Sequence, residues 1–517
     1  MQQHQSKDFC HGSMHHSLRM SLTPTLLRKI SVGTVAAVTS AFVANNALQR
    51  FVYRYPRKDP NHQEPLPDGP FPVCPLQRFM DNPRESSPSF GPGVFFYNRS
   101  RRLRHLPIWK FLGAKKKGVV IVSGLQNTKT VLNLEFSSIF GQSVPFSSAM
   151  TGANSLRYAN ERKQHSFLRN LVGAGMSAAN VASMIPALQQ ASESVLDGQE
   201  TKQWKMHEIC MDFTLEVATK QIIGLQVSNE EKSVLRQALA DWLGLIFDVN
   251  NDKALKAQEY ILGKIEDRIK QLEGPDGSAL AAMVFEKDEE SGGNRLTRQQ
   301  IIDNTQLLIF AGSETSAGTL TLCFLLLGLN PSKYAKLVEE HKHVVNEHGT
   351  ALSRDVLDKA MPYTDAVVKE ALRIRPIVGG AMRGTAETIV VDGKQIPAGW
   401  SVTYDRHLTH LLDPVTYKED ESHMDVRTGF QPERWLDAAT KPSEFIPFGY
   451  GPRYCLGAGL AMTEMKVFLS VVVRRLSSIE MVEPNPTEPI LWKERCIVPV
   501  PRDGVVIEGP QVIEAPA

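Results

Sequence analysis

Cys455 stands in the part of the sequence that most plainly indicates chemistry. The loop from Phe448 to Gly457 is rich in glycine and contains a proline, and a helical pattern begins directly after it at Ala458. A cysteine at this place faces backbone N–H groups and the positive end of the helix dipole, so we expect a lowered thiol pKa and a thiolate. A thiolate is the form in which cysteine binds metals.

The neighbours of Cys455 support a ligated sulfur. Gly451 and Gly457 let the backbone turn and bring N–H groups close to the sulfur, Phe448 can shield it from water, and Arg453 can reach an anionic cofactor edge. The alternative for Cys455 is a buried cysteine in a turn. We interpret the other five cysteines as small buried hydrophobic residues: Cys10, Cys74, Cys210, Cys323 and Cys496.

The spacing Phe-x-x-Gly-x-Arg-x-Cys-x-Gly resembles the haem-binding loop of cytochromes P450. In that family a cysteine thiolate holds the haem iron and favours cleavage of the O–O bond. The resemblance implies a haem cofactor (iron protoporphyrin IX) with Cys455 as its axial metal ligand. It extends from about Leu66 to Arg502.

A second candidate site lies in a long apolar helical segment. Gly312, Glu314 and Thr315 interrupt it, and a glycine inside a helix costs about 1 kcal/mol relative to alanine, which suggests a purpose. In P450s this pattern lies over the haem, and the acid and the alcohol guide protons to dioxygen. The alternative is a polar patch solvated at a helix bend.

Three basic residues complete the predicted cofactor site. His165 and Arg169 are four residues apart and therefore share one helical face. The resemblance implies that both residues, together with Arg383, contact the haem propionates, because arginine suits bidentate pairing with carboxylates. A solvated basic helix that includes Arg162 and Lys163 is the alternative.

Glu370 and Arg373 form an E-x-x-R pair on one helical face. In P450s an arginine that corresponds here to Arg434 joins such a pair in a buried triad that supports the haem loop. We assign these three residues to structure, because buried charges are costly unless they are mutually bonded.

The predicted fold is mainly α-helical with small peripheral β-sheets, and one large helical core encloses the haem. Residues 108–112 and 119–122 should form a hairpin, and residues 389–396 a strand–turn–strand. Apolar residues recur at helical spacing in the following segments: 201–223, 230–247, 255–272, 297–329, 332–347, 355–372 and 458–476.

The chain divides into three predicted parts. Residues 1–50 read as a targeting or membrane-anchor segment, because the apolar stretch Ile30–Leu48 is flanked by basic residues. Residues 51–75 form a proline-rich linker, and residues 76–517 the monooxygenase domain. A retained anchor at the endoplasmic reticulum membrane and a plastid location after removal of a presequence remain alternatives.

The overall composition excludes several classes of function. A formal net charge of +2 in 517 residues gives no indication of a nucleic-acid partner. The six cysteines are scattered, which argues against a zinc site and a disulfide framework.

The resemblance implies a haem monooxygenase, which would insert one oxygen atom from O₂ into an apolar small molecule such as a retinoid, carotenoid, sterol or fatty acid. It also implies electrons that come ultimately from NAD(P)H through a reductase or ferredoxin. We expect this partner to dock near Cys455, where Lys466, Arg474 and Arg475 could contribute. The alternatives are an oxygen-independent haem-thiolate isomerase or dehydratase, and a haem-binding protein without catalysis.

Three further expectations concern particular segments. Residues 140–165, 225–260 and 377–382 should build the substrate pocket. Residues 417–429 should be a surface insertion. Residues 375–404 most resemble the branch that holds retinoic-acid hydroxylases, their cyanobacterial relatives and plant steroid hydroxylases.

Overall fold

The computed structural model describes residues 59–67, 108–112, 118–141, 145–199, 202–225, 227–246, 248–488, 490–492, 498 and 500–509. The predicted targeting segment, residues 1–50, lies outside the described residues. The chain from Lys58 onward forms one compact unit.

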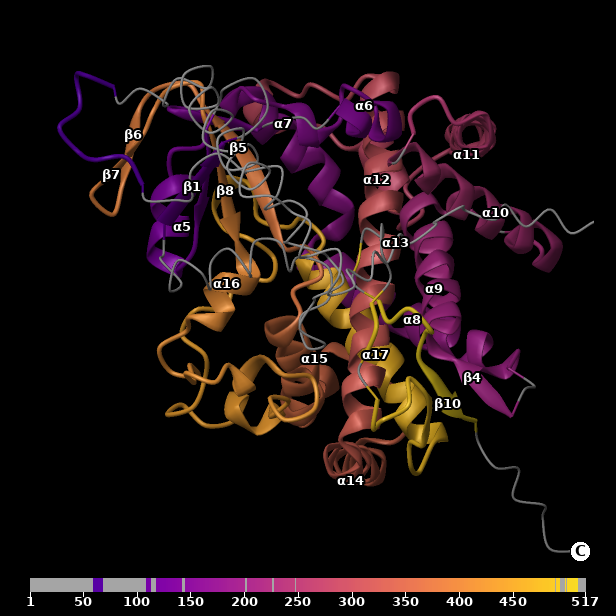
Figure 1. The fold of residues 1–517 in the computed structure, drawn as a ribbon. Coiled ribbons are helices and arrows are strands. Elements are labelled where there is room, and N and C mark those ends of the chain that lie inside the picture. The colour runs from indigo at the N-terminus through magenta and orange to yellow at the C-terminus, as the bar shows by residue number, and fades with distance from the viewer. Residues whose placement is uncertain are drawn as a thin grey trace, which may run out of the picture. The chain divides into compact units, whose positions relative to one another are not determined.

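Helices dominate this unit, as predicted (Figure 1). They are α5 (Leu125–Leu132), α6 (Pro145–Thr151), α7 (Arg162–Gly173), α8 (Ala178–Asp197), α9 (Met206–Val217), α10 (Asn229–Trp242), α11 (Asp252–Gln271), α12 (Ala279–Phe285), α13 (Arg298–Leu329), α14 (Pro331–His348), α15 (Pro362–Ile374), α16 (Arg406–Leu411) and α17 (Ala458–Arg475).

The strands of the described residues form three small sheets, which confirms the other half of the predicted fold class. The largest has the order β1 (Ile108–Leu112), β2 (Gly118–Val122), β8 (Ser401–Asp405), β5 (Gly380–Thr385) and β3 (Ile139–Gly141). A second has the order β4 (Gln203–Lys205), β10 (Val506–Glu508) and β9 (Met481–Glu483), and β6 (Ile389–Val391) pairs with β7 (Lys394–Ile396). Both predicted hairpins are present.

Helix α13 runs through the core and packs against α9, α15 and α17 (Figure 1). It begins with a capping box between Thr297 and Gln300, and its second half is buried on all sides. The hydroxyls of Ser313, Thr315 and Thr319 each donate to the carbonyl four residues earlier. These bonds satisfy polar groups that would otherwise be costly in an apolar environment.

Two of the predicted helices are interrupted. The segment 201–223 begins as strand β4, because Trp204 is buried between exposed neighbours and pairs with Ile507, and it ends in a π-helical turn, η5 (Ala218–Ile223). The segment 355–372 is divided at Met361, because Pro362 cannot continue a preceding helix but suits the first turn of α15.

Part of the predicted linker packs against the β6–β7 hairpin. The backbone N–H of Asp59 donates to the Gln395 side chain at 2.7 Å, and the backbone N–H of Gln395 donates to the Pro65 carbonyl at 2.9 Å. Leu66 packs against the apolar cluster beneath the sheet. Residues 59–67 are thus attached to the folded unit.

Candidate active site

The Cys455 loop is held by its own backbone. Gly449 and Gly451 adopt φ values of 81° and 72°, which favour glycine, and a short turn, η11 (Gly451–Arg453), follows. The Cys455 N–H donates to the Phe448 carbonyl at 3.0 Å, and α17 begins at Ala458. The sulfur therefore lies just ahead of a helix N-terminus, and the Gly457 N–H donates to it.

The expected lowering of the Cys455 pKa is wrong for the protein without its cofactor. Burial raises the pKa of the thiol, and this outweighs the Gly457 N–H and the charges of Arg406 and Arg169, which lower it. The side chain is accessible because it faces a cavity, although protein atoms crowd its other sides. A bound metal ion would supply the missing stabilisation, since coordination deprotonates a thiol.

The cavity has a volume of about 620 Å³ and lies between the Cys455 loop and α13. Most of its wall is apolar, with leucines and valines from α7, α9 and α13. Among the residues predicted for the site, it brings together Gly312, Thr315, Phe448, Arg453, Cys455, Gly457, His165, Arg169 and Arg383. Glu314 and Gly451 are not among its lining residues.

The cavity wall comes from two of the three predicted pocket segments. Residues of 140–165 and of 377–382 contribute, whereas no described residue of 225–260 does. The reason is that α10 and α11 pack against each other, and Ile222, Leu307 and Leu308 occupy the wall instead.

Basic side chains gather at one end of the cavity. Arg383 and Arg453 line it, and each donates through Nε to Glu135 at 2.6 Å. Burial, followed by the charges of Arg453, Arg169 and Arg383, lowers the pKa of His165 to about 4, so this histidine is neutral at pH 7. Positive charge at this end therefore comes from the arginines.

The α13 side of the cavity carries a hydroxyl. Thr315 Oγ1 donates to the Ala311 carbonyl at 2.7 Å, so its lone pairs remain as acceptors. A Cβ atom on Gly312 would meet only Ile222 Cδ1, at an ordinary 3.4 Å, so helix packing does not require this glycine. Glu314 is half-buried.

Sequence reasoning missed three residues here: Glu135, Arg406 and Glu464. Arg406 lines the cavity and donates to the Val378 carbonyl at 2.6 Å and to the Tyr404 hydroxyl at 3.0 Å, while its buried Nε has no partner among the described residues. Glu464 is a cavity residue on α17 with a side-chain hydrogen bond to Ser316. The available signal for Glu464 was a carboxylate whose neighbours three and four residues away on the helix are all apolar: Leu460, Ala461, Val467 and Phe468.

The pKa of Glu464 makes protein stability depend on pH. Burial raises this pKa to about 8, from the ordinary 4.5 expected in the unfolded chain. The unfolded chain therefore loses this proton first, and the group opposes folding increasingly as pH rises from 4.5 to about 8. We expect Glu464→Gln to increase the free energy of unfolding by about 3 kcal/mol more near pH 8.5 than near pH 5.5.

Denaturant unfolding at both pH values measures this difference, with Glu480→Gln as the control. Glu480 is exposed, so its replacement should change stability equally little at both pH values. An equal effect of Glu464→Gln at the two pH values would contradict a raised pKa.

Glu370, Arg373 and Arg434 form a separate buried cluster that includes the turn preceding the Cys455 loop in the sequence. Glu370 accepts from Arg373 Nε and Nη2 and from Arg434 Nε, each at 2.9 Å. It also accepts from the Gln431 N–H at 3.1 Å and the Trp435 indole at 2.9 Å. These bonds join α15 to η10 (Pro432–Trp435), the turn that leads towards the Cys455 loop.

The segment 417–429 is not a surface insertion throughout. Tyr417 is exposed, but His423 and Met424 are buried, and the His423 carbonyl accepts from Arg373 at 2.6 Å. A side chain on Gly429 would clash with the His423 carbonyl, 2.6 Å from the Cβ position. The second half of the segment 417–429 therefore supplies carbonyl groups that accept hydrogen bonds from Arg373.

Of the three basic residues proposed for electron-partner docking, Lys466 is wrongly assigned. Lys466 is only 6% exposed and binds Asp358 at 3.0 Å. Arg474 and Arg475 lie at the far end of α17, about 27 Å along the helix from its start after Cys455. They bind the Thr350 carbonyl and Asp197.

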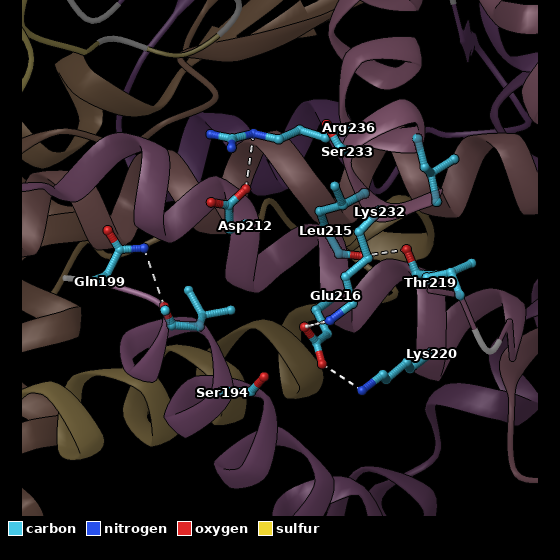
Figure 2. A pocket seen from close by; sticks show the side chains of 14 residues that line it. Ser194, Gln199, Asp212, Leu215, Glu216, Thr219, Lys220, Lys232, Ser233 and Arg236 are labelled. Atoms are coloured by element: carbon cyan, nitrogen blue, oxygen red, sulfur yellow. Dashed lines mark hydrogen bonds and ion pairs between the residues drawn. The ribbon is translucent and has the colours of Figure 1, made fainter. Parts of the chain in front are cut away.

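A second pocket, of about 440 Å³, lies beside α9, η5 and α10 (Figure 2). Figure 2 shows Glu216 between Lys220 and Lys232, at 2.6 and 3.0 Å, and Asp212 bound to Arg236 at 3.0 Å. These charges are paired with one another, and the pocket contains none of the predicted site residues.

The walls of the first cavity fit a haem group. One cysteine lines it, which suits a haem iron whose other ligands come from the porphyrin. Cations at one end suit two carboxylates, and the apolar wall suits the macrocycle.

Comparison with known proteins agrees with this site. Residues 95–502 match the family model "Cytochrome P450". The chain is 28% identical over 411 residues to Cytochrome P450 26B1 of Xenopus tropicalis, covering 75% of this chain and 77% of the relative. It is 26% identical to Cytochrome P450 26A1 of Danio rerio, covering 80% and 85%.

A solved structure, "Retinoic acid bound cyanobacterial CYP120A1", has the same fold. Its TM-score is 0.69 at 23% identity, and the match covers 86% of this chain and 99% of that one. This chain belongs to the cytochrome P450 family. It is a haem-thiolate monooxygenase that takes an apolar substrate and electrons from a redox partner, and the resemblance to the branch with the cyanobacterial and retinoic-acid proteins is confirmed.

Proposed function

We propose that Cys455 supplies the axial thiolate of the haem and that this chain uses dioxygen to hydroxylate a retinoid-like apolar molecule. The observation that carries this proposal is one cavity lined by Cys455, by Thr315 and by five arginines, among them Arg169, Arg383 and Arg453. When bound, haem supplies dioxygen binding and oxygen-atom transfer.

The chain's own residues hold the cofactor and control protons. Arg169, Arg383 and Arg453 would hold the carboxylates, with neutral His165 beside them. Thr315 presents acceptor lone pairs to the cavity and would hold a water there. Glu314 lies one residue earlier, outside the cavity wall, so we propose that it supplies protons through water rather than by direct contact.

Two observations support a retinoid-like substrate: the apolar wall of the cavity and one similar solved structure. The cavity that Thr315 lines is mostly apolar, and its wall includes Leu308, Val172 and Ile377. Retinoic acid is bound in the similar cyanobacterial structure. A binding screen by the shift of the Soret band, across retinoids, carotenoids, sterols and fatty acids, tests this: a carotenoid or sterol as the only binder would contradict it.

Residues 1–50 would place the protein at the endoplasmic reticulum membrane, with a plastid location after cleavage as the alternative. The electron donor would be a reductase at that membrane, or a ferredoxin in a plastid, and NAD(P)H the ultimate source. Fluorescent fusions of the full chain and of residues 51–517 distinguish the two locations.

The decisive test is optical. The purified, haem-loaded protein is reduced, CO is added, and the far-red-shifted Soret band of thiolate-ligated haem is sought. Its presence supports the thiolate. A band typical of histidine-ligated haem would contradict the proposal.

Replacing Thr315 with alanine should uncouple electron use from product formation. Loss of the Thr315 acceptor removes a hydrogen bond worth about 1 kcal/mol, so product formed per NAD(P)H should fall about fivefold or more, with hydrogen peroxide released instead. Thr305→Ala is the control, because Thr305 lies on the same helix and makes the same backbone bond but does not line the cavity.

An unchanged product yield in Thr315→Ala would contradict the relay. The two alternatives give different results in the same assay. An isomerase or dehydratase forms product without NAD(P)H or dioxygen, and a non-catalytic haem protein forms none.

A further inference from the structure

Glu135 is a buried carboxylate for which the proposed function has no role. It is 1% exposed and follows α5 in a turn where the N–H groups of Ser137, Ser138 and Ile139 all donate to the Leu134 carbonyl. Its backbone position is therefore fixed. Its side chain points to the two arginines at the basic end of the cavity.

Glu135 binds both arginines in the same way. Oε1 accepts from Arg453 Nε and Oε2 accepts from Arg383 Nε, each at 2.6 Å. One carboxylate thus holds two guanidinium groups that come from the Cys455 loop and from β5. Both groups line the cavity.

The two arginines keep different capacities for a ligand. Arg453 Nη1 and Nη2 donate to the carbonyls of Arg157 and Ala159 at 3.2 and 2.6 Å, so this group also anchors the chain ahead of α7. Arg383 Nη1 donates to the Met382 carbonyl at 3.0 Å, and no hydrogen bond joins its Nη2 to another described residue. Arg383 therefore retains a donor for a carboxylate.

The arginines make the cavity strongly basic. Arg169, Arg383 and Arg453 line it together with Arg157 and Arg406, and His165 is neutral at pH 7. Glu135 supplies a negative charge bound to two of these arginines. It therefore lowers the net positive charge that the two carboxylates of haem would meet.

We propose that Glu135 is a positioning residue that holds Arg383 and Arg453 on the cavity wall and sets the net charge at the carboxylate end of the haem. This inference rests on the proposed haem binding. A competing role, in which Glu135 occupies the arginines until haem displaces it, predicts the opposite change in haem retention.

The test compares Glu135→Gln with the wild type in the haem-loaded full chain. Glutamine keeps the volume but loses the charge, so the arginines lose their common anchor. Haem transfer to excess apomyoglobin should become about tenfold faster or more. The haem reduction potential should rise, because removal of a nearby negative charge favours the reduced state.

Two further variants separate position from charge. Glu135→Asp keeps the charge but is too short to reach both arginines, so haem loss should accelerate while the potential stays near that of the wild type. Glu387→Gln is the control, because Glu387 is exposed and binds Ser138 in the same turn region. It should change neither quantity.

Unchanged or slower haem loss in Glu135→Gln would overturn the inference. If Glu135→Gln gives no folded protein, the rate of haem loss and the reduction potential are measured on Glu135→Asp instead. A rate of haem loss equal to that of the wild type in Glu135→Asp would then overturn the inference. The CO spectrum of the wild type tests the proposed function by itself. A thiolate band with unaltered haem loss in the variants would thus reject only the role of Glu135.

Discussion

Replacing Cys455 with alanine is expected to abolish the red-shifted CO band completely while the protein remains folded. Alanine offers no ligand to iron, and no other described cysteine lines the cavity. Because the variant also loses the bond between sulfur and iron, haem affinity should fall. The measurements are the CO difference spectrum and the haem content per chain.

Cys323→Ala is the matched control. Cys323 is buried in α13, and burial raises the pKa of its thiol to about 12. Its replacement should leave the CO band in place. A band that survives in Cys455→Ala, or that disappears in Cys323→Ala at full haem content, would contradict the ligand assignment.

Replacing Glu370 with glutamine is expected to lower the free energy of unfolding by about 3–5 kcal/mol. Arg373 is 0% exposed and Arg434 is nearly buried, so loss of the carboxylate leaves two buried cations without their counter-ion. Because the cluster joins α15 to the turn before the haem loop, the haem content of expressed protein should fall as well. Denaturant unfolding measures the main effect.

Glu433→Gln provides a comparison in the same turn. Glu433 binds Lys333 and Lys336 at 2.9 and 2.6 Å, but all three side chains are partly exposed. Pairs of this kind contribute about 0–1 kcal/mol each. If the free energy of unfolding falls no more in Glu370→Gln than in Glu433→Gln, the buried triad does not stabilise the fold.

Local sequence signals predicted several of the regular elements correctly. The hairpin at residues 108–122 and the long helix that ends at Leu329 are present. Prediction was wrong where tertiary pairing competed with helical periodicity. Trp204 is an example, since it pairs with β10, a strand some 300 residues later in the chain.

The sequence predicted poorly whether charged and polar residues are exposed or buried. Lys466 and residues 417–429 read as exposed, yet Lys466 binds Asp358, and the second half of 417–429 surrounds Arg373. In each case burial depends on a partner supplied by a distant segment. Spacing in the sequence carries no information about such partners.

The sequence alone determined the family, the mainly helical fold with small sheets, and the residues near the cavity. Fixed spacing around Cys455 and the Gly312–Thr315 pattern were enough, because these short motifs carry their own backbone geometry. Only the tertiary structure decided that Glu135 joins Arg383 to Arg453, that Glu464 faces the cavity, and that Glu314 does not line it. The physical reason is that charge pairing and burial depend on which segments the fold brings together.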